Sequence, residues 1–341
     1  MPPGWPVCPS SPVNQLSQPV PSAAPCSPLP SPTPKETHPV SIVLGPNRYG
    51  KAESRVVRIY RDEARHEIRD INVSTALRGD FAGAHLFGDQ SKVLPTDSQK
   101  QTAYAFAKEK GLVSIEDYGM TLGSHLVDTV EHIDSARVEI EEFAWQRVLV
   151  DGAEHDHTWI RQGQETRTAA ITVTGRGATR ETTVIAGFKD LTILKSTGSE
   201  FAGFYQDPYT VLEPTNDRIM ATSLVAQWRF SGTPTSWESV YAGVKQILVS
   251  TFATVHSLAL QQTLYEMGKA VLEEFDDIVE IRFSAPNKHH FLYNLAPFGI
   301  ENNNEVFNAD DRPYGLIQAT VLRDDVAPAP AEAWDSYTGL V

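Results

Sequence analysis

The chain has 341 residues, 41% of them hydrophobic and 21% charged, with 43 acidic against 29 basic side chains. No apolar run reaches the ~18–20 residues that would cross a bilayer, which excludes an integral membrane protein. A formal charge of −14 repels phosphate backbones, which argues against a nucleic-acid binder. Both cysteines, Cys8 and Cys26, lie near the N-terminus. The rest of the chain therefore has no thiolate for a zinc site, a disulfide framework or a cysteine nucleophile, which favours a reducing, cytoplasmic location.

Residues 1–37 are predicted to form a disordered, proline-rich extension. The first 34 residues contain 12 of the 23 prolines and no charged side chain. Proline lacks the backbone donor that helices and sheet interiors need. The segment has neither a basic start nor a continuous apolar stretch, so it does not read as a secretory signal. At the other end, residues 328–341 are expected to be a flexible tail.

The first half, residues 38–178, is predicted to contain a strand pair, a helix pair and a second strand pair. Its elements are expected at residues 55–60, 66–73, 98–108, 115–130, 137–148 and 167–173. Ser114 is placed to cap the second helix. The strand at 137–148 changes its alternation at Glu141 and Glu142, as a β-bulge would.

The second half, residues 179–327, repeats this order of elements. They are expected at residues 182–185, 191–195, 222–230, 236–255, 259–275, 279–283 and 317–321. Thr235 and Glu238 form a capping box before the first helix. The repeat predicts an α+β architecture of two antiparallel four-stranded sheets, each with helices on one face. The open edges need partners, so sheets of neighbouring subunits are expected to close into a barrel.

Familiar cofactor and nucleophile signatures fail on inspection. Gly175 and Gly177 begin like a dinucleotide-binding loop, but Arg180 stands where the third glycine belongs, and a loop between the halves is the simpler interpretation. There is no Gly-x-Ser-x-Gly elbow and no flavin, haem or nicotinamide motif. A redox enzyme with this sequence is therefore expected to work without a cofactor.

His155 and His157 could offer two imidazoles to one metal ion. Alternate residues of a strand point to the same face, so the geometry is possible. The sequence identifies no third ligand. A polar turn is therefore the preferred interpretation of this segment.

Three short clusters are unusual for purely structural sequence: residues 47–51, 94–100 and 286–290. Each also has a simpler explanation. Lys51 would be a solvated surface charge, and Thr96 would cap a helix together with Gln99. The third cluster would be an exposed turn.

Taken together, these clusters resemble the urate oxidase (uricase) family, and its bacterial branch in particular. The matching motifs are Tyr49-Gly50-Lys51, Thr96-Asp97, residues 194–204, Asp217-Arg218, His256-Ser257, residues 261–265, and Pro286-Asn287-Lys288-His289 followed by His290. They run in register from about residue 38 to residue 325. Matches of this length, in this order, are highly specific.

The resemblance implies two tandem T-fold domains, at residues 38–178 and 179–327. It further implies a homotetramer around a tunnel, with active sites shared between subunits. Members of the family oxidise urate with molecular oxygen to 5-hydroxyisourate and hydrogen peroxide, and they need neither a metal nor an organic cofactor. The chain lacks the Ser-Lys-Leu ending that addresses proteins to peroxisomes, so a bacterial cytoplasm is expected.

Lys51, Thr96 and His289 take the catalytic positions of the family. An ordinary lysine is a poor base because its pKa is ~10.4, but desolvation or a nearby cation lowers that value. The amine could then accept a proton from the Thr96 hydroxyl, which in turn takes a proton from bound urate. The resemblance implies that His289 holds or relays protons and that Asn287 faces the oxygen or water site.

Substrate recognition is assigned by the resemblance to Arg218 and Gln261. A guanidinium fork and a carboxamide can hydrogen-bond the edge of a planar purine anion. Phe201 offers a flat face for stacking. Asp97 and Leu260 contribute mainly backbone contacts in the family, and Thr96 also contacts the substrate.

Two other functions stay open. One is a T-fold hydrolase or aldolase acting on pterins, although the zinc-dependent members use cysteine and histidine ligands and the folded region has no cysteine. The other is a non-catalytic purine-binding oligomer. The intact set of Lys51, Thr96 and His289 argues against this second alternative.

Overall fold

The computed structural model describes residues 41–234 and 236–336. The sheet and its helices all belong to the compact unit that begins at Leu44. The extension predicted at 1–37, both cysteines and Thr235 of the predicted capping box lie outside the described residues. Within the described residues, no helix is both long and apolar enough to span a membrane.

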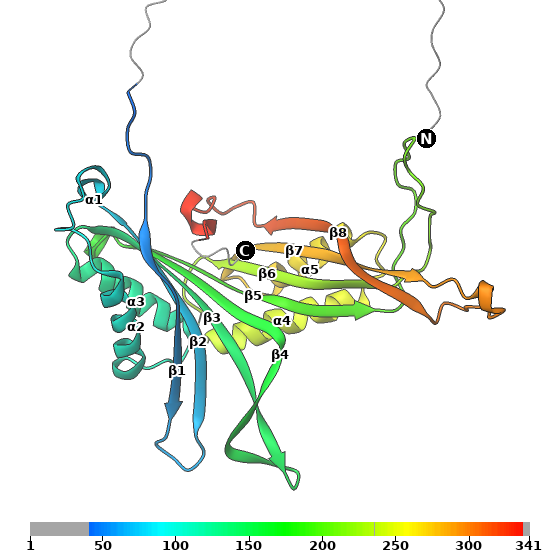
Figure 1. The fold of residues 1–341 in the computed structure, drawn as a ribbon, viewed down its shortest axis with the longest axis horizontal. Helices are drawn as coiled ribbons and strands as arrows, with labels where there is room; N and C mark the ends of the chain where they lie inside the picture. The colour runs from blue at the N-terminus through cyan, green and yellow to red at the C-terminus, as the bar shows by residue number, and fades with distance from the viewer. Residues whose placement is uncertain (1–40, 235, 337–341) are drawn as a thin grey trace, which may run out of the picture. The chain divides into compact units, whose positions relative to one another are not determined.

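One eight-stranded antiparallel sheet forms the frame, with the strands side by side in chain order (Figure 1). The strands are β1 (Tyr49–Tyr60), β2 (Glu67–Gly79), β3 (Ile133–Val150), β4 (Ala153–Thr174), β5 (Glu181–Lys195), β6 (Met220–Phe230), β7 (Ile278–Leu292) and β8 (Phe307–Leu322). The predicted α+β class is confirmed. The two predicted four-stranded sheets are joined into one, because β4 pairs with β5. This pairing runs from Thr166 opposite Lys189 to Thr174 opposite Glu181.

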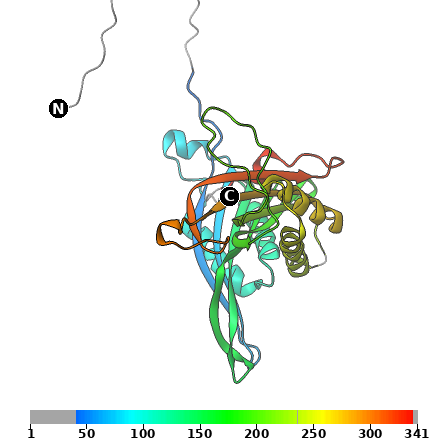
Figure 2. The ribbon, with the colours of Figure 1, turned by 90° about the vertical axis from the view of Figure 1, so that its right-hand side faces the viewer.

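Two helix pairs pack against this sheet (Figure 2). The helices are α1 (Ala82–Phe87), α2 (Thr96–Glu109), α3 (Ile115–Thr129), α4 (Trp237–Thr254) and α5 (Leu260–Glu274). Ser114 caps α3 as predicted, because its hydroxyl accepts a hydrogen bond from the Asp117 amide at 3.0 Å. Ser236 caps α4 in the same way, accepting from Ser239 at 3.3 Å. The sequence pattern did not predict the short helix α1.

Strand alternation places one set of side chains beneath the helices. Ile171, Trp228 and Ile281 are completely buried in this core. Fully burying a large apolar side chain contributes about 1.5–3 kcal/mol. Gly268 lets α5 approach the sheet closely, since a Cβ at this position would lie 2.6 Å from Cγ2 of Val321. The helix-covered face therefore supplies most of the apolar packing.

The opposite face is crossed by the C-terminal segment, residues 327–336. Ala333 is buried there against Ala170 and Ile185, and a short 3-10 helix spans Ala331–Trp334. The sequence predicts a flexible tail from residue 328. In its described part, the structure instead shows a segment packed on the sheet.

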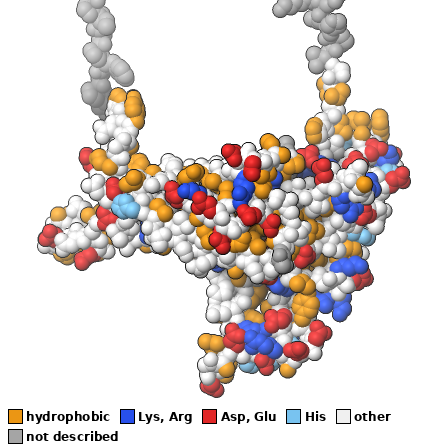
Figure 3. Space-filling view, turned by 180° about the vertical axis from the view of Figure 1, so that it is seen from behind, with side chains coloured by type: hydrophobic (Ala, Val, Ile, Leu, Met, Phe, Trp, Pro, Cys, Tyr) orange, Lys and Arg blue, Asp and Glu red, His pale blue; other side chains and the backbone are white. Residues whose placement is uncertain are grey.

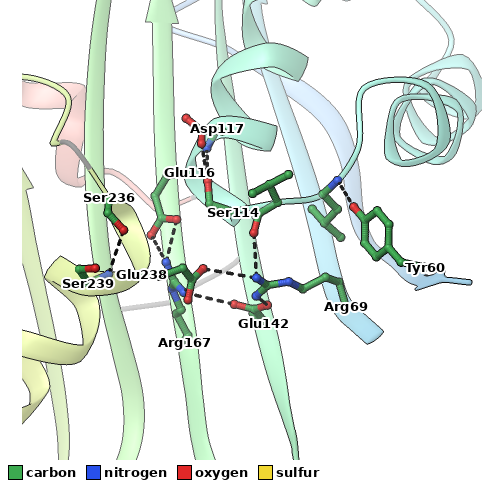
Figure 4. Close-up of polar contacts among 12 residues, drawn as sticks. Tyr60, Arg69, Ser114, Glu116, Asp117, Glu142, Arg167, Ser236, Glu238 and Ser239 are labelled. Atoms are coloured by element: carbon green, nitrogen blue, oxygen red, sulfur yellow. Dashed lines mark hydrogen bonds and ion pairs between the residues drawn. The ribbon is translucent and has the colours of Figure 1, made fainter. Parts of the chain in front are cut away.

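An ion cluster, buried at Arg167 and Glu116, connects strands of the first half with α3 and with α4 of the second half (Figure 4). Arg167 of β4 donates to both carboxylate oxygens of Glu116 in α3, at 3.0 and 2.9 Å, and pairs with Glu238 in α4 at 2.9 Å. Arg69 of β2 pairs with Glu142 at 2.7 Å and with Glu238 at 3.6 Å. Burial raises the pKa of the Glu116 carboxyl, and Arg167 opposes that shift. Charge pairing therefore joins α3 and α4 at this seam.

The bulge predicted at Glu141 and Glu142 is absent from those positions. Both residues pair in register with β2 and β4, and the register of β3 against β4 shifts between Phe143 and Trp145. The alternation of polar and apolar residues changes in the sequence because these two adjacent carboxylates are both largely buried. Glu141 pairs with Lys189, and burial of a charged group is tolerated when it is paired.

The outer surface carries charges of both signs. Figure 3 shows acidic and basic side chains interspersed over the face seen from behind. The net charge of −14 is therefore not gathered into one acidic patch on that face.

Candidate functional site

Lys51 lies on β1 where its pairing with β2 becomes irregular. Lys51 is paired with Thr75, and the register shifts before Ser54. Glu53 adopts a positive φ of 57° within this shift. β-Bulges of this kind re-aim side chains and are frequent beside active sites. Lys51 is half-buried at the end of the regular ladder.

A chain of hydrogen bonds ties this part of β1 to the start of α2. The Lys51 amide donates to Oγ1 of Thr75 at 3.4 Å, and the Thr75 hydroxyl donates to Oε1 of Gln99 at 2.7 Å. Nε2 of the completely buried Gln99 donates to the carbonyl of Leu94 at 3.3 Å. The network holds the first turn of α2 against the strand that carries Lys51.

Thr96 and Asp97 are the first two residues of α2. The N-cap is Pro95, without any side-chain capping bond, so the explanation of Thr96 as a helix cap is wrong. Nζ of Lys100 lies 2.5 Å from Oδ1 of Asp97. This contact holds the pKa of the Asp97 carboxyl below its usual range, and the charge of Lys51 acts in the same direction. Lys51, Thr96 and Asp97 form what we call the Lys51 half-site.

A hollow of about 670 Å³ lies between the start of α5, the ends of β7 and β8, and the loop before β6. Six residues singled out from the sequence line it: Phe201, Arg218, Leu260, Gln261, Asn287 and His289. We call this hollow the Arg218 pocket. Its volume is in the range typical of small-molecule sites.

Arg218 and Phe201 are held together by the loop between β5 and β6. Phe201 exchanges two backbone hydrogen bonds with Thr215, at 2.8 and 2.9 Å, and the Arg218 amide donates to the carbonyl of Ser199 at 2.9 Å. The guanidinium carbon lies 5.2 Å from the Phe201 ring centre. Burial lowers the pKa of Arg218, and its Nε is buried without a partner among the described residues. Because an unpaired buried donor costs about 1–3 kcal/mol, an acceptor on a bound ligand would remove that cost.

Helix α5 presents its N-terminus to the pocket through Leu260 and Gln261. The N-cap Ala259 offers no side-chain acceptor to the amides of the first turn. Leu260 is buried and Gln261 is exposed. Free amides and the positive end of the helix dipole favour a negatively charged or carbonyl ligand at this point.

Asn287 and His289 come from an irregular stretch of β7. Asn287 pairs with Gly315 and His289 with Asp310, and the register against β8 shifts between them. The rings of His289 and Phe291 are stacked, with centroids 5.6 Å apart. The pocket thus combines a partly buried cation, an aromatic face, amide groups and an imidazole.

Within one chain, the Lys51 half-site and the Arg218 pocket belong to distant strands. β1 is one edge of the sheet, and β7 is next to the opposite edge (Figure 1). Neighbouring strands are ~4.8 Å apart along a sheet, and five strands lie between these two. The structure therefore brings six predicted site residues into one pocket and places Lys51, Thr96 and Asp97 outside its lining.

Further residues that the sequence analysis did not single out also line the pocket, among them Leu212, Glu213, Asn304 and Phe307. Leu212 and Glu213 lie in the same loop as Phe201 and Arg218. Asn304 and Phe307 come from the connection between β7 and β8 and from the start of β8. No motif marks them, because only the pairing of β7 with β8 brings that connection to the pocket.

The histidine pair considered for a metal lies in strand β4, so the predicted turn is wrong. The ring centroids of His155 and His157 are 4.5 Å apart, and those of His66 and His157 are 5.9 Å apart. Among residues 41–234 and 236–336, no group of three or more histidine, cysteine or acidic side chains is arranged to hold a metal ion.

These features define an α+β protein with a pocket suited to a planar anion. The sequence model of the uricase family matches residues 47–172 and 184–318, and the chain belongs to that family. The predicted enzyme class, an oxidoreductase of the urate oxidase type, is confirmed.

Known relatives agree with this assignment. The uricase of Arthrobacter globiformis is 47% identical over 299 residues, covering 88% of this chain and 96% of the relative, which confirms the bacterial type. The uricase of Dictyostelium discoideum is 34% identical, covering 81% of this chain and 96% of the relative.

Solved structures also share the fold. The crystal structure of Arthrobacter globiformis uricase matches with a TM-score of 0.81 at 47% identity, covering 86% of this chain and 99% of that one. Urate oxidase of Bacillus sp. TB-90 matches with a TM-score of 0.72 at 22% identity, covering 81% of this chain and 100% of that one, which shows the fold alone.

Proposed function

We propose that this chain oxidises urate with oxygen and water to 5-hydroxyisourate and hydrogen peroxide, without a cofactor, in purine catabolism. The observation that carries the proposal is the Arg218 pocket, where a partly buried guanidinium with a buried, unpaired Nε lies beside an aromatic ring and a helix N-terminus. A planar, singly charged purine with carbonyl groups on its edge satisfies all three features at once.

Arg218 and Gln261 grip the edge of the purine in this proposal. The guanidinium donates to a urate carbonyl and balances its charge, while the Gln261 carboxamide binds the adjoining carbonyl and N–H groups. Phe201 stacks on the ring, and Leu260 closes the pocket with its backbone amide and apolar side chain. These contacts fix the orientation in which the ring meets oxygen.

The Lys51 half-site supplies the proton chemistry. Lys51 accepts a proton from the Thr96 hydroxyl, and Thr96 takes one from urate, which makes the ring electron-rich enough to reduce oxygen. The backbone of Asp97 holds the substrate on the same side. Asn287 faces the oxygen or water site, and His289 relays protons to the peroxide and from the attacking water.

The two parts of this site come from different subunits in the proposed assembly. A homotetramer in which the sheet edges close around a tunnel brings β1 of one subunit to the Arg218 pocket of another. The two sheet halves, residues 38–178 and 179–327, act as tandem T-fold domains in that arrangement. We place the enzyme in the bacterial cytoplasm, where its partners are urate, oxygen and its own copies, without nucleic acid or membrane.

The test is turnover by the purified full chain in buffer containing a metal chelator. Loss of the near-ultraviolet absorbance of urate should be matched by one peroxide per urate consumed. Urate binding without peroxide release would instead identify a non-catalytic purine-binding protein. Activity that disappears with the chelator and returns with an added metal would reject the cofactor-free mechanism.

A further inference from the structure

The C-terminal segment makes contacts with most strands of the helix-free face. Arg229 of β6 donates to the carbonyl of Ala327 at 3.2 Å, and Arg137 of β3 donates to the carbonyl of Ala333 at 2.8 Å. Ala333 itself is 1% exposed. A segment held by buried side-chain and backbone contacts along its length is a fixed part of the sheet surface.

The face beneath the segment is rich in arginine. Arg48, Arg78, Arg137, Arg229 and Arg282 all contact the segment. The described part of the segment contributes two carboxylates to this face, and both form ion pairs with arginine there. Charge complementarity therefore fits the segment to this surface.

Asp335 anchors the segment to the strand pair that carries Lys51. Its Oδ2 accepts hydrogen bonds from Arg48 and Arg78, both at 2.9 Å. Arg48 also donates to the carbonyl of Ser336 at 2.8 Å. Arg48 directly precedes β1 and lies three residues before Lys51, so the carboxylate of Asp335 restrains the start of that strand.

Trp334 anchors the same segment to β7. The guanidinium carbon of Arg282 lies 3.9 Å from the Trp334 ring centre, and Nε of Arg282 donates to Glu280 at 2.8 Å, which orients the stack. Asn287 and His289 lie a few residues further along the same strand. Two adjacent residues of the segment thus contact the strands of both parts of the site.

We propose that Asp335 and Trp334 are positioning residues, which clasp β1 to β7 and so set the spacing between the Lys51 half-site and the Arg218 pocket. Neither residue lines the pocket. In a ring of identical subunits, the spacing within each chain decides how well Lys51 of one copy meets the pocket of the next. This inference rests on the proposed function, because it assumes that the two parts of the site act on one substrate.

The test compares the thermal stability, kcat and KM of Asp335→Asn with those of Asp325→Asn, both made in the full chain. Asp335 is half-exposed, so losing its ion pairs should change thermal stability little. Misplacing a catalytic group by a fraction of an ångström slows chemistry, so kcat of Asp335→Asn should fall ~3–10-fold with KM changed less than ~2-fold. Asp335→Glu should restore most of the rate. Asp325→Asn, which removes an exposed carboxylate outside the clasp, should keep wild-type values.

Hydrogen exchange supplies a readout that does not depend on activity. Amides at residues 48–51 should exchange faster in Asp335→Asn than in the wild type, and Asp325→Asn should leave them unchanged. Unchanged exchange at 48–51, or faster exchange with an unaltered kcat, would overturn the inference. Failure of the wild type to consume urate would reject the proposed function, while the exchange comparison would still show whether the clasp holds β1.

Discussion

Gly50 shows how closely the backbone around Lys51 is determined. A Cβ at this position would lie 1.7 Å from the carbonyl oxygen of Thr75, so only glycine fits between β1 and β2. The next residue is Lys51, whose amide is held by the Thr75 hydroxyl. The backbone that carries this lysine is therefore fixed before any substrate binds.

Replacing Lys51 with methionine should abolish most of the turnover. The variant keeps the length and apolar stem of the side chain but removes the proposed base, so kcat should fall ~10²–10⁴-fold, while the Kd for urate changes only a few-fold. Steady-state kinetics and equilibrium binding measure the two effects. Lys92→Met, at an exposed lysine paired with Asp80, is the matched control and should be unaffected. Wild-type kcat in Lys51→Met would reject the relay.

Replacing Arg218 with alanine should act mainly on binding. Removing a charged hydrogen-bond donor from a partly buried site costs about 2–3 kcal/mol, so Kd for urate should rise ~30–150-fold. Arg218→Lys keeps the charge but loses the forked guanidinium, so its Kd for urate should lie between those of the wild type and Arg218→Ala. Isothermal titration of the three proteins with urate in the absence of oxygen, where no turnover can occur, checks the order. Equal affinity in all three would remove Arg218 from the recognition site.

At the scale of elements, the site depends on where strands and helices begin and end. Helix α5 starts at Leu260 without a side-chain cap, and α2 starts at Thr96 after Pro95. Both helix starts therefore offer amides to a ligand instead of to their own caps. The ion cluster at Arg167 holds α3 and α4 in place, which fixes the two helix pairs relative to the sheet.

Replacing Arg167 with methionine should destabilise this seam strongly. Glu116 is 1% exposed, and losing its cation leaves a buried charge unpaired. The free energy of unfolding should fall by about 3–5 kcal/mol, measured by urea denaturation at neutral pH. Arg65→Met removes an exposed ion pair and should cost less than ~1 kcal/mol.

The stability of Arg167→Met should depend on pH, and the sign of that dependence follows from Glu116. Burial already raises the pKa of Glu116 above its unfolded value. Such a carboxyl contributes most stability below its unfolded pKa, and that contribution is lost as the pH rises through the folded value. Without Arg167 the folded pKa rises further, so Arg167→Met should regain part of its lost stability on mild acidification. Stability that keeps falling from neutral pH downward would contradict this account.

At the scale of the whole molecule, the two parts of the proposed site lie far apart in one chain. Lys51 is on the edge strand β1, and the pocket adjoins the opposite edge strand β8. Exposed apolar side chains lie in and beside the pocket, among them Phe291, Leu292 and Leu316. Edge strands and apolar surface of this kind favour association with another copy.

Mixing two inactive variants tests whether copies share the site. Lys51→Met damages one part and Arg218→Ala the other, so neither homo-oligomer should turn over urate efficiently. When the two are unfolded and reassembled together, about a quarter of the sites should combine two intact parts and recover activity. Each variant reassembled alone is the control. No recovery in the mixture would mean that both parts of a working site come from one chain.

The predictable parts of this protein follow from local patterns. Helix α3 follows from the spacing of Ile115, Tyr118, Leu122 and Leu126 and from its Ser114 cap, because helices repeat every 3.6 residues wherever they pack. The burial of both Glu141 and Glu142, which are adjacent and face opposite sides of β3, misled the same approach. Their burial depends on cations from other elements, which local alternation does not contain.

The sequence by itself determined the α+β class, the repeated order of elements and the family, because each depends on residue periodicity and on motifs that can be matched along the chain. The tertiary structure alone decided that six predicted site residues share one pocket, that Lys51 lies on another part of the sheet, and that the C-terminal segment crosses the helix-free face. These relations depend on strand pairing and on charges meeting from elements far apart in the chain. Such contacts leave no periodic signal along the sequence.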